Sequence, residues 1–276
     1  MTSTRERQRA AARARLEKEM AQRAAAAKKR RQLQASIGAG AGLLLVVVLT
    51  VWGVTSLGDD ETETPQATDD GQAGAGCVWN EVPAEQRSPT VKDVGVPPTT
   101  TPPSTGTQLM TLDTSFGEIQ VTMNLADVPC TAASFSHLAS QGFWDNTKCH
   151  RMFPGMLQCG DPSATGEGYR DSDGTGGPSY QFANENLPVD DRPAYPAGVV
   201  AMANSGPDTN GSQFFFIYED VELSPDYTVL GQVTEGLDVI QEATAEGHDG
   251  AFDPSPGGGH PNSDIVINSL TVSEPQ

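Results

Sequence analysis

A stretch of 21 residues without a charged side chain, residues 37–57, divides this 276-residue chain into two parts of opposite charge. As a helix, the stretch would be about 30 Å long, which matches the hydrocarbon core of a bilayer. Residues 1–36 hold eleven basic and three acidic residues, whereas residues 37–276 hold six basic and 33 acidic ones. Because cytoplasmic flanks of membrane helices are enriched in Lys and Arg, this pattern predicts a basic cytoplasmic tail at 1–36 and a transmembrane signal anchor at 37–57.

Two other interpretations of residues 37–57 stay open. A buried helix of a soluble domain seldom runs this long without a charge, and a cleavable signal peptide would have a shorter basic region and a small-residue cleavage site after the apolar run. We therefore expect an uncleaved, single-pass anchor in the cell membrane, with the rest of the chain extracytoplasmic. The basic tail suits contact with anionic lipids. Nucleic-acid binding is not expected, because the bulk of the chain is strongly acidic.

Residues 58–107 have the composition of a disordered linker. The first part is acidic and polar, and residues 97–105 are rich in Pro and Thr. Neither part has enough apolar residues to bury a core. Residues 77–79, Cys-Val-Trp, interrupt the linker and suggest a local tether.

The folded domain is predicted at residues 108–274 and is mainly β. Polar and apolar residues alternate as in strands at 110–114 and 117–123, and Pro129 begins a helical pattern that continues to residue 141. Many short strands with two helices indicate a β-barrel capped by helices. The remaining expected elements are strands at 199–203, 214–218, 229–233 and 265–272 and a second helix at 237–244.

Four cysteines follow the predicted anchor: Cys77, Cys130, Cys149 and Cys159. An even number in an oxidising compartment favours disulfides, and three pairings are possible. We favour Cys149–Cys159, which are ten residues apart across an expected hairpin, and this leaves Cys77–Cys130 to attach the linker to the first helix. A zinc site is not expected, since no CxxC or HxxxH spacing occurs.

Three blocks of sequence, residues 143–151, 157–162 and 202–215, carry the specific signal. Here the chain resembles the cyclophilins, which are peptidyl-prolyl cis–trans isomerases, and the third block is close to the longest signature of that family. The resemblance covers nearly all of the folded domain and implies an eight-stranded closed antiparallel β-barrel capped by two α-helices. The order of tail, anchor, linker and extra cysteines is similar to that of membrane-anchored extracytoplasmic actinobacterial members.

The resemblance also implies a chemistry. Rotation about an X–Pro bond faces a barrier of about 18–20 kcal/mol, because resonance gives the C–N bond double-bond character. Lowering that barrier needs a hydrogen-bond donor near the prolyl nitrogen and a pocket that holds the ring. Arg151 is the expected donor because a guanidinium stays protonated and offers a rigid fork of N–H groups. The other expected catalytic residues are His150 and Gln158, with Gln158 orienting that fork.

The expected substrate site is an apolar pocket with a polar wall. Its residues, taken from positions that match the family, are Met156, Leu157, Ala203, Asn204, Ser205, Gln213, Phe215, Leu223 and Tyr227. The implied partners are proline-containing polypeptides in secreted, membrane or cell-wall proteins. No cofactor or metal is expected, and the chain is expected to be a monomer.

Three departures from the family pattern bear on this site. The chain between Arg151 and Gln158 is one residue shorter than usual, so either Met156 or Phe153 replaces the usual aromatic pocket residue. Tyr227 stands in place of a groove histidine. Glu222 replaces a tryptophan that contacts the drug cyclosporin, which implies weak cyclosporin binding. The alternative function is a non-catalytic chaperone that binds proline-containing segments in the same groove.

Overall fold

The computed structural model describes residues 76–276 except 189–192, 222 and 255–256. The predicted tail, the predicted anchor and the first part of the predicted linker therefore lie outside the described residues. In the described part, the helices are too short or too polar to cross a bilayer.

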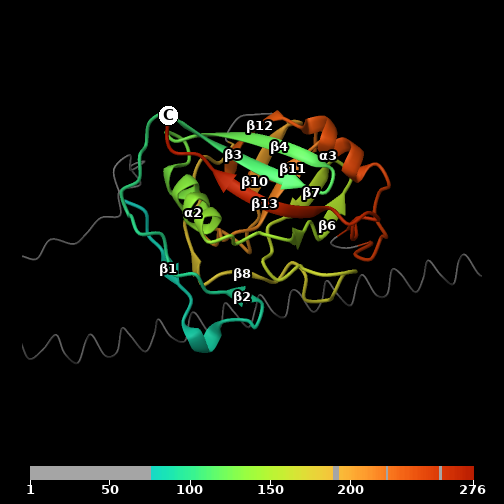
Figure 1. Cartoon of the computed structure of the whole chain (residues 1–276), viewed down its shortest axis with the longest axis horizontal. Coiled ribbons are helices and arrows are strands. Elements are labelled where there is room, and N and C mark those ends of the chain that lie inside the picture. Colours follow the sequence, from blue (N-terminus) through green and yellow to red (C-terminus); the bar gives the residue numbers. More distant parts are fainter. Residues whose placement is uncertain (1–75, 189–192, 222, 255–256) are drawn as a thin grey trace, which may run out of the picture. The chain divides into compact units, whose positions relative to one another are not determined.

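A single antiparallel sheet of nine strands forms the body of the described part (Figure 1). Its longest ladder is the hairpin of β3 and β4, which pair over eight residues and alternate buried with more exposed side chains. The sheet order is β5 (Thr147–Lys148), β13 (Val266–Val272), β3 (Thr107–Thr114), β4 (Gly117–Asn124), β12 (Val229–Glu235), β10 (Val199–Met202), β11 (Phe214–Ile217), β7 (Met156–Cys159) and β6 (Arg151–Phe153).

The predicted eight-stranded closed barrel is not confirmed. In the described residues, β5 and β6 are the two edges of the sheet and no ladder joins them. The prediction of a mainly β domain with two helices is confirmed: the sheet is curled, and α2 (Pro129–Ser140) and α3 (Leu237–Thr244) pack on it. The predicted strands and helices match the observed ones within a few residues at each end.

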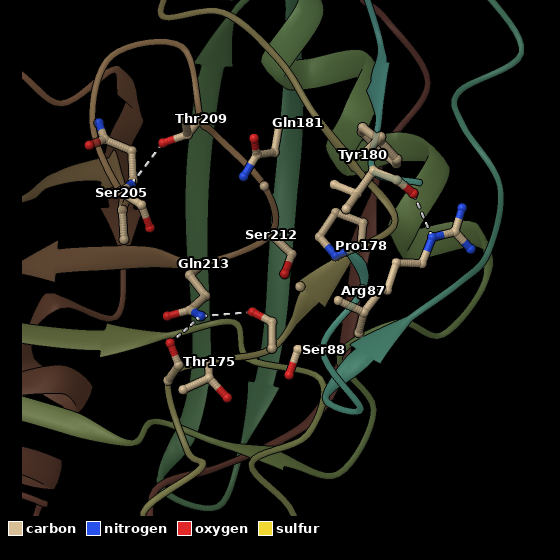
Figure 2. Close-up of a pocket in the computed structure, with 18 of the residues that line it drawn as sticks. Arg87, Ser88, Thr175, Pro178, Tyr180, Gln181, Ser205, Thr209, Ser212 and Gln213 are labelled. Atoms are coloured by element: carbon tan, nitrogen blue, oxygen red, sulfur yellow. Dashed lines mark hydrogen bonds between the residues drawn. The ribbon is translucent and has the colours of Figure 1, made fainter. Parts of the chain in front are cut away.

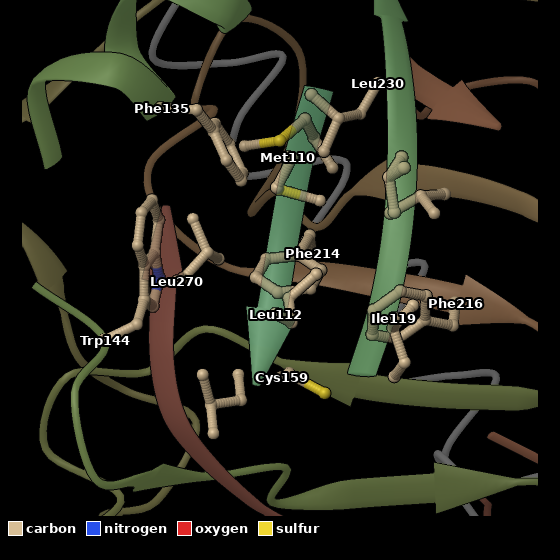
Figure 3. Packing of buried hydrophobic residues seen from close by; sticks show 14 of the residues in the cluster. Met110, Leu112, Ile119, Phe135, Trp144, Cys159, Phe214, Phe216, Leu230 and Leu270 are labelled. Atoms are coloured by element: carbon tan, nitrogen blue, oxygen red, sulfur yellow. The ribbon is translucent and has the colours of Figure 1, made fainter. Parts of the chain in front are cut away.

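The hydrophobic core fills the inner side of the curled sheet (Figure 3). Met110 and Leu112 of β3 belong to this core together with Phe135 of α2, whose ring lies 4.9 Å from that of Trp144 and 5.8 Å from that of Phe214. All five side chains are fully buried. This core holds the strands in place from the inner side of the sheet. The side chains on the outer face form a separate cluster.

Residues 76–106 are folded onto the domain, although their composition predicts a disordered linker. Within them, β1 (Asn80–Glu81) pairs with β9 (Tyr180–Gln181), and β2 (Val91–Lys92) pairs with β8 (Gly177–Pro178). A short 3₁₀ helix, η1 (Ala84–Gln86), connects the two strands. We call residues 77–93 the N-terminal segment. Its ordering comes from contacts with distant residues, which local composition does not reveal.

Both favoured disulfides are present. Cys149 bonds Cys159 across the β6–β7 hairpin, and Cys77 bonds Cys130 in the first turn of α2. The second bond attaches the N-terminal segment to the domain, as the predicted tether requires. The four cysteines are therefore structural.

Candidate functional site

Arg151, Gln158 and Phe215 lie in one row across the outer face of the sheet. Arg151 on β6 pairs with Gln158 on β7, and Gln158 pairs with Phe215 on β11. Directly paired residues of antiparallel strands project to the same side. The register of three strands thus brings these predicted residues together, although they are up to 64 positions apart in the chain.

The Arg151 guanidinium is held at the edge of this row by two aromatic rings. Its central carbon lies 5.5 Å from the ring centre of Phe153 and 6.0 Å from that of Phe252. One of its five N–H donors contacts a protein acceptor, the Gly257 carbonyl at 3.4 Å, and its buried Nε has no hydrogen-bond partner among the described residues. Within the part of the chain that the structure describes, the side chain is therefore positioned mainly by the two rings, and most of its N–H donors have no partner there.

An apolar cluster adjoins Phe215 on the same face. Met156, Ala201 and Ile217 are buried in it, and the side chains of Phe153, Ala203, Leu223 and Tyr227 are partly buried against it. The short hairpin turn at Pro154–Gly155, where Gly155 has φ +84°, places Phe153 directly opposite Met156. Both candidates for the missing aromatic residue therefore belong to the cluster.

Tyr227 is fixed over this cluster by its main chain. Its ring meets that of Phe215 edge to face at 5.4 Å, and the Tyr195 hydroxyl both accepts a hydrogen bond from the Tyr227 N–H and donates one to the Tyr227 carbonyl. Burial raises the pKa of Tyr195 to about 12, so this hydroxyl keeps its proton throughout the physiological range.

The prediction that Leu157 lines the pocket is wrong. Successive residues of a strand project to opposite faces. Met156 and Gln158 face outward, and Leu157, 1% exposed, joins Met152 and Phe216 in the inner core. Leu157 therefore contributes to stability and not to the groove.

His150 does not line an open surface either. Its ring is buried against the turn at Gly174, where an added Cβ would lie 3.0 Å from the ring, and neither ring nitrogen has a partner among the described residues. Burial lowers its pKa to about 4, although Asp161 and Asp173 oppose this shift. At neutral pH, His150 is an uncharged packing residue beside Arg151.

This buried histidine predicts a pH-dependent stability. The folded chain protonates His150 only near pH 4, whereas the ordinary value is 6.5, so unfolding takes up a proton between these values. The free energy of unfolding should be highest above about pH 6.5, and it should fall by up to about 3 kcal/mol as the pH is lowered towards 4. Urea unfolding across this range should show a flatter profile for His150→Gln than for wild type. The control His248→Gln should keep the wild-type slope, and equal slopes for all three proteins would refute this assignment.

The polar wall beside the row is made by Gln213 and its neighbours. The Gln158 side-chain N–H donates to the Gln213 side-chain oxygen at 2.9 Å, and Gln213 in turn donates to the Gly174 and Gly176 carbonyls at 2.9 and 2.8 Å. The expected hydrogen bond from Gln158 to Arg151 is not among those recorded for the described residues. Gln158 is instead fixed from the opposite side, by Gln213.

Asn204 and Ser205 form the rim of this wall. The Asn204 side chain donates to the Asp226 carbonyl at 3.0 Å, which joins the loop after β10 to the loop that bears Tyr227. The Ser205 N–H donates to the Thr209 hydroxyl at 2.8 Å (Figure 2). A pocket of about 500 Å³ lies beside this rim. Its lining includes Gln158 together with Ala203, Asn204, Ser205 and Gln213.

Sequence reasoning missed Phe252 and Tyr195. Phe252 belongs to a Gly/Pro-rich loop in which nothing in the sequence indicates a contact with Arg151, and Tyr195 reaches Tyr227 from 32 positions away. Glu222, which bears on the cyclosporin expectation, lies outside the described residues.

The chain belongs to the cyclophilin family: the model of the family described as "Cyclophilin type peptidyl-prolyl cis-trans isomerase/CLD" matches residues 109–272, which is more than half of its length. The match spans β3 to β13 and includes the outer-face row and its cluster.

Mycobacterial relatives extend this result. The chain is 41% identical over 186 residues to the probable peptidyl-prolyl cis-trans isomerase B of Mycobacterium leprae, covering 62% of this chain and 59% of that protein. It is 37% identical over 214 residues to the protein of the same name from Mycobacterium tuberculosis, covering 72% and 64%. The chain thus spans about three fifths of the length of these relatives.

Solved structures agree on the fold. A crystal structure of a cyclophilin-type peptidyl-prolyl cis-trans isomerase of Cryptosporidium parvum superimposes with a TM-score of 0.51 at 23% identity, covering 62% of this chain and 99% of that one. At this identity, the likeness concerns the fold alone. The N-terminal segment lies before the family match.

Proposed function

We propose that the chain accelerates cis–trans isomerisation of X–Pro bonds in extracytoplasmic polypeptides, with the proline ring bound on the outer-face cluster. The observation that carries the proposal is the row of Arg151, Gln158 and Phe215 beside that cluster. It joins an apolar surface to a cation that makes one hydrogen bond, to Gly257, among the described residues. The family membership of the chain supports the same reaction.

The mechanism requires no covalent step. When an X–Pro amide twists, its resonance is lost and the nitrogen lone pair becomes localised. An N–H of Arg151 donates to that nitrogen and stabilises the twisted state more than the planar one, which lowers the barrier. Phe215 and Met156 hold the ring while the preceding carbonyl rotates. Gln158, fixed by Gln213, limits where the substrate backbone lies.

The proposed location rests on the sequence. A basic tail at 1–36 and an anchor at 37–57 would keep the chain in the cell membrane with the groove outside. The two disulfides support an oxidising compartment, since such bonds are rare in the reducing cytosol. The proposed clients are proline-containing secreted, membrane or cell-wall proteins, and we propose that the chain acts as a monomer.

A protease-coupled assay on the full chain with a short X–Pro peptide tests the proposed function. The wild type should accelerate the slow phase, and Phe215→Ala should raise KM about tenfold, because an aromatic side chain in a desolvated pocket contributes more than 1 kcal/mol to binding. The matched control is Leu187→Ala, which truncates an exposed apolar side chain outside the groove. Its KM should equal that of wild type. If a folded, oxidised wild type leaves the slow phase unchanged, the groove is not an isomerase, and the non-catalytic chaperone becomes the leading function.

A further inference from the structure

The loop that follows α3 supplies two of the contacts of Arg151. It lies beside β6 at the edge of the sheet (Figure 1). The Phe252 ring centre is 6.0 Å from the central carbon of the guanidinium, and the Gly257 carbonyl is 3.4 Å from one of its nitrogens. We call the described residues of this loop, 249–254 and 257–260, the Arg151 loop. The orientation of the proposed donor therefore depends partly on how the loop is held.

The Arg151 loop is attached to the strand that carries Arg151. The Met152 N–H donates to the Gly259 carbonyl at 2.8 Å, and the Gly259 N–H donates to the Met152 carbonyl at 2.9 Å. A Cβ on Gly258, where φ is +80°, would overlap the Met152 carbonyl, so this close approach requires a glycine. The end of the loop next to Gly257 is thus fixed to the chain neighbour of Arg151.

The two loop residues that contact the guanidinium are also hydrogen-bonded to each other. The Gly257 N–H donates to the Phe252 carbonyl at 3.0 Å, and the Phe252 N–H donates to the Gly258 carbonyl at 3.0 Å. A movement of one contact would therefore move the other. The ring and the carbonyl act on the guanidinium as one unit.

One carboxylate closes the Arg151 loop at its base. Asp249 Oδ1 accepts from the Ala251 N–H at 2.9 Å and from the His260 N–H at 2.8 Å, and Asp249 Oδ2 accepts from the His260 Nδ1–H at 2.9 Å. Burial opposes the ionisation of this group, but the hydrogen bonds outweigh burial and lower the pKa of Asp249. The carboxylate is therefore charged at neutral pH, and it joins residues eleven positions apart.

The His260 ring connects this carboxylate to Phe252. It meets the Phe252 ring edge to face, with 4.8 Å between the ring centres. It also stacks on the Tyr169 ring at 4.5 Å, with the two planes 11° apart, and this contact helps to fix its orientation. A continuous row of contacts thus runs from Asp249 through His260 and Phe252 to the guanidinium.

We infer that Asp249 and His260 are positioning residues for Arg151. Through Phe252 and the Gly257 carbonyl, they keep the guanidinium in one orientation towards the groove. The inference rests on the proposed function, because it requires that Arg151 acts on the X–Pro amide. A misdirected donor would stabilise the twisted amide less. Neither Asp249 nor His260 belongs to the described apolar cluster, so the pair should affect turnover and not the binding of the proline ring.

Exchange NMR of a blocked Ala-Pro dipeptide with the full, oxidised chain tests the inference. Asp249→Ala should lower kcat about fivefold to tenfold and leave KM unchanged, because the donor remains but loses its orientation. The Asp249 side chain is 45% exposed, so its removal leaves no cavity in the core. Asp249→Asn keeps an acceptor for the two backbone N–H groups and should restore about half of the wild-type kcat.

A spectroscopic signal separates positioning from a general loss of structure. The Arg151 Nε–H resonance, identified as the one that Arg151→Ala lacks, should shift in Asp249→Ala because the Phe252 ring moves. Phe252→Leu keeps the backbone hydrogen bonds of the loop; it should shift the same resonance and lower kcat about threefold. This second variant decides the test if Asp249→Ala does not fold. The matched control is Asp127→Asn, which changes an exposed carboxylate that pairs with Asn124, and it should equal wild type in both measurements.

The outcomes separate the two claims. If wild type does not accelerate isomerisation of the dipeptide, the proposed function fails. If wild type is active but Asp249→Ala and Phe252→Leu keep its kcat, the positioning inference fails and the proposed function stands. A fall in kcat without a shift of the Arg151 resonance, or a rise in KM at unchanged kcat, would also overturn the inference, because the loop would then act by another route.

Discussion

Arg151→Ala should lower kcat/KM on a short X–Pro peptide by about 100-fold, the size of effect expected when one preorganised donor to a transition state is removed. The reason is that Arg151 is the cationic member of the outer-face row, and most of its N–H donors have no partner among the residues that the structure describes. Substrate binding should change much less, since the apolar cluster stays intact. Steady-state kinetics that separate kcat from KM measure both effects.

Two further variants support this assignment. Arg151→Lys keeps the charge but loses the planar fork that lies between Phe153 and Phe252, so its rate should fall between those of wild type and Arg151→Ala. Arg170→Ala removes another arginine, which is exposed and pairs with Asp173 outside the row, and should be neutral. An Arg151→Ala variant that is folded and retains wild-type kcat would contradict the proposed mechanism.

Loss of the Cys149–Cys159 disulfide should reduce both stability and activity. Cys149 directly precedes His150 and Arg151, and Cys159 directly follows Gln158, so the bond fixes the two strands that carry the row. Closing a loop of ten residues is worth about 2–3 kcal/mol in the chain-entropy model. The Cys149→Ala/Cys159→Ala variant should lose about that much free energy of unfolding in urea, together with part of its kcat/KM.

The other disulfide provides the matched control. Cys77→Ala/Cys130→Ala releases the N-terminal segment, which lies outside the sheet. Its rate on the Ala-Pro dipeptide should equal that of wild type. If the Cys149→Ala/Cys159→Ala variant were as stable and active as wild type, the bond would have no role in holding the row.

The sequence predicted the strands and helices well because their signal is local. Alternating residues in β3 and β4 and the Pro129 helix start are visible without any tertiary contact. Motif positions also brought Arg151, Gln158 and Phe215 to one site. The prediction for Leu157 followed the family positions and not strand alternation, which turns Leu157 away from Met156 and Gln158, as its pairing with Phe216 of β11 shows.

The N-terminal segment shows the limit of composition. Residues 76–106 contain few apolar side chains, and their order depends on one disulfide, on Trp79 and on two-residue ladders with strands 86 to 101 positions away. Contacts of this kind leave no periodic pattern in the sequence. The same holds for Phe252, which reaches Arg151 from a loop 101 positions further along the chain.

The most direct test of the central claim is two-dimensional exchange NMR of a short X–Pro peptide with a catalytic amount of the full, oxidised chain. Wild type should produce cis–trans exchange cross-peaks within seconds, whereas uncatalysed exchange takes tens to hundreds of seconds. Arg151→Ala should still shift the peptide resonances, which reports binding, but should give almost no cross-peaks. Exchange peaks of equal intensity from both proteins, or none from a folded wild type that binds the peptide, would contradict the account.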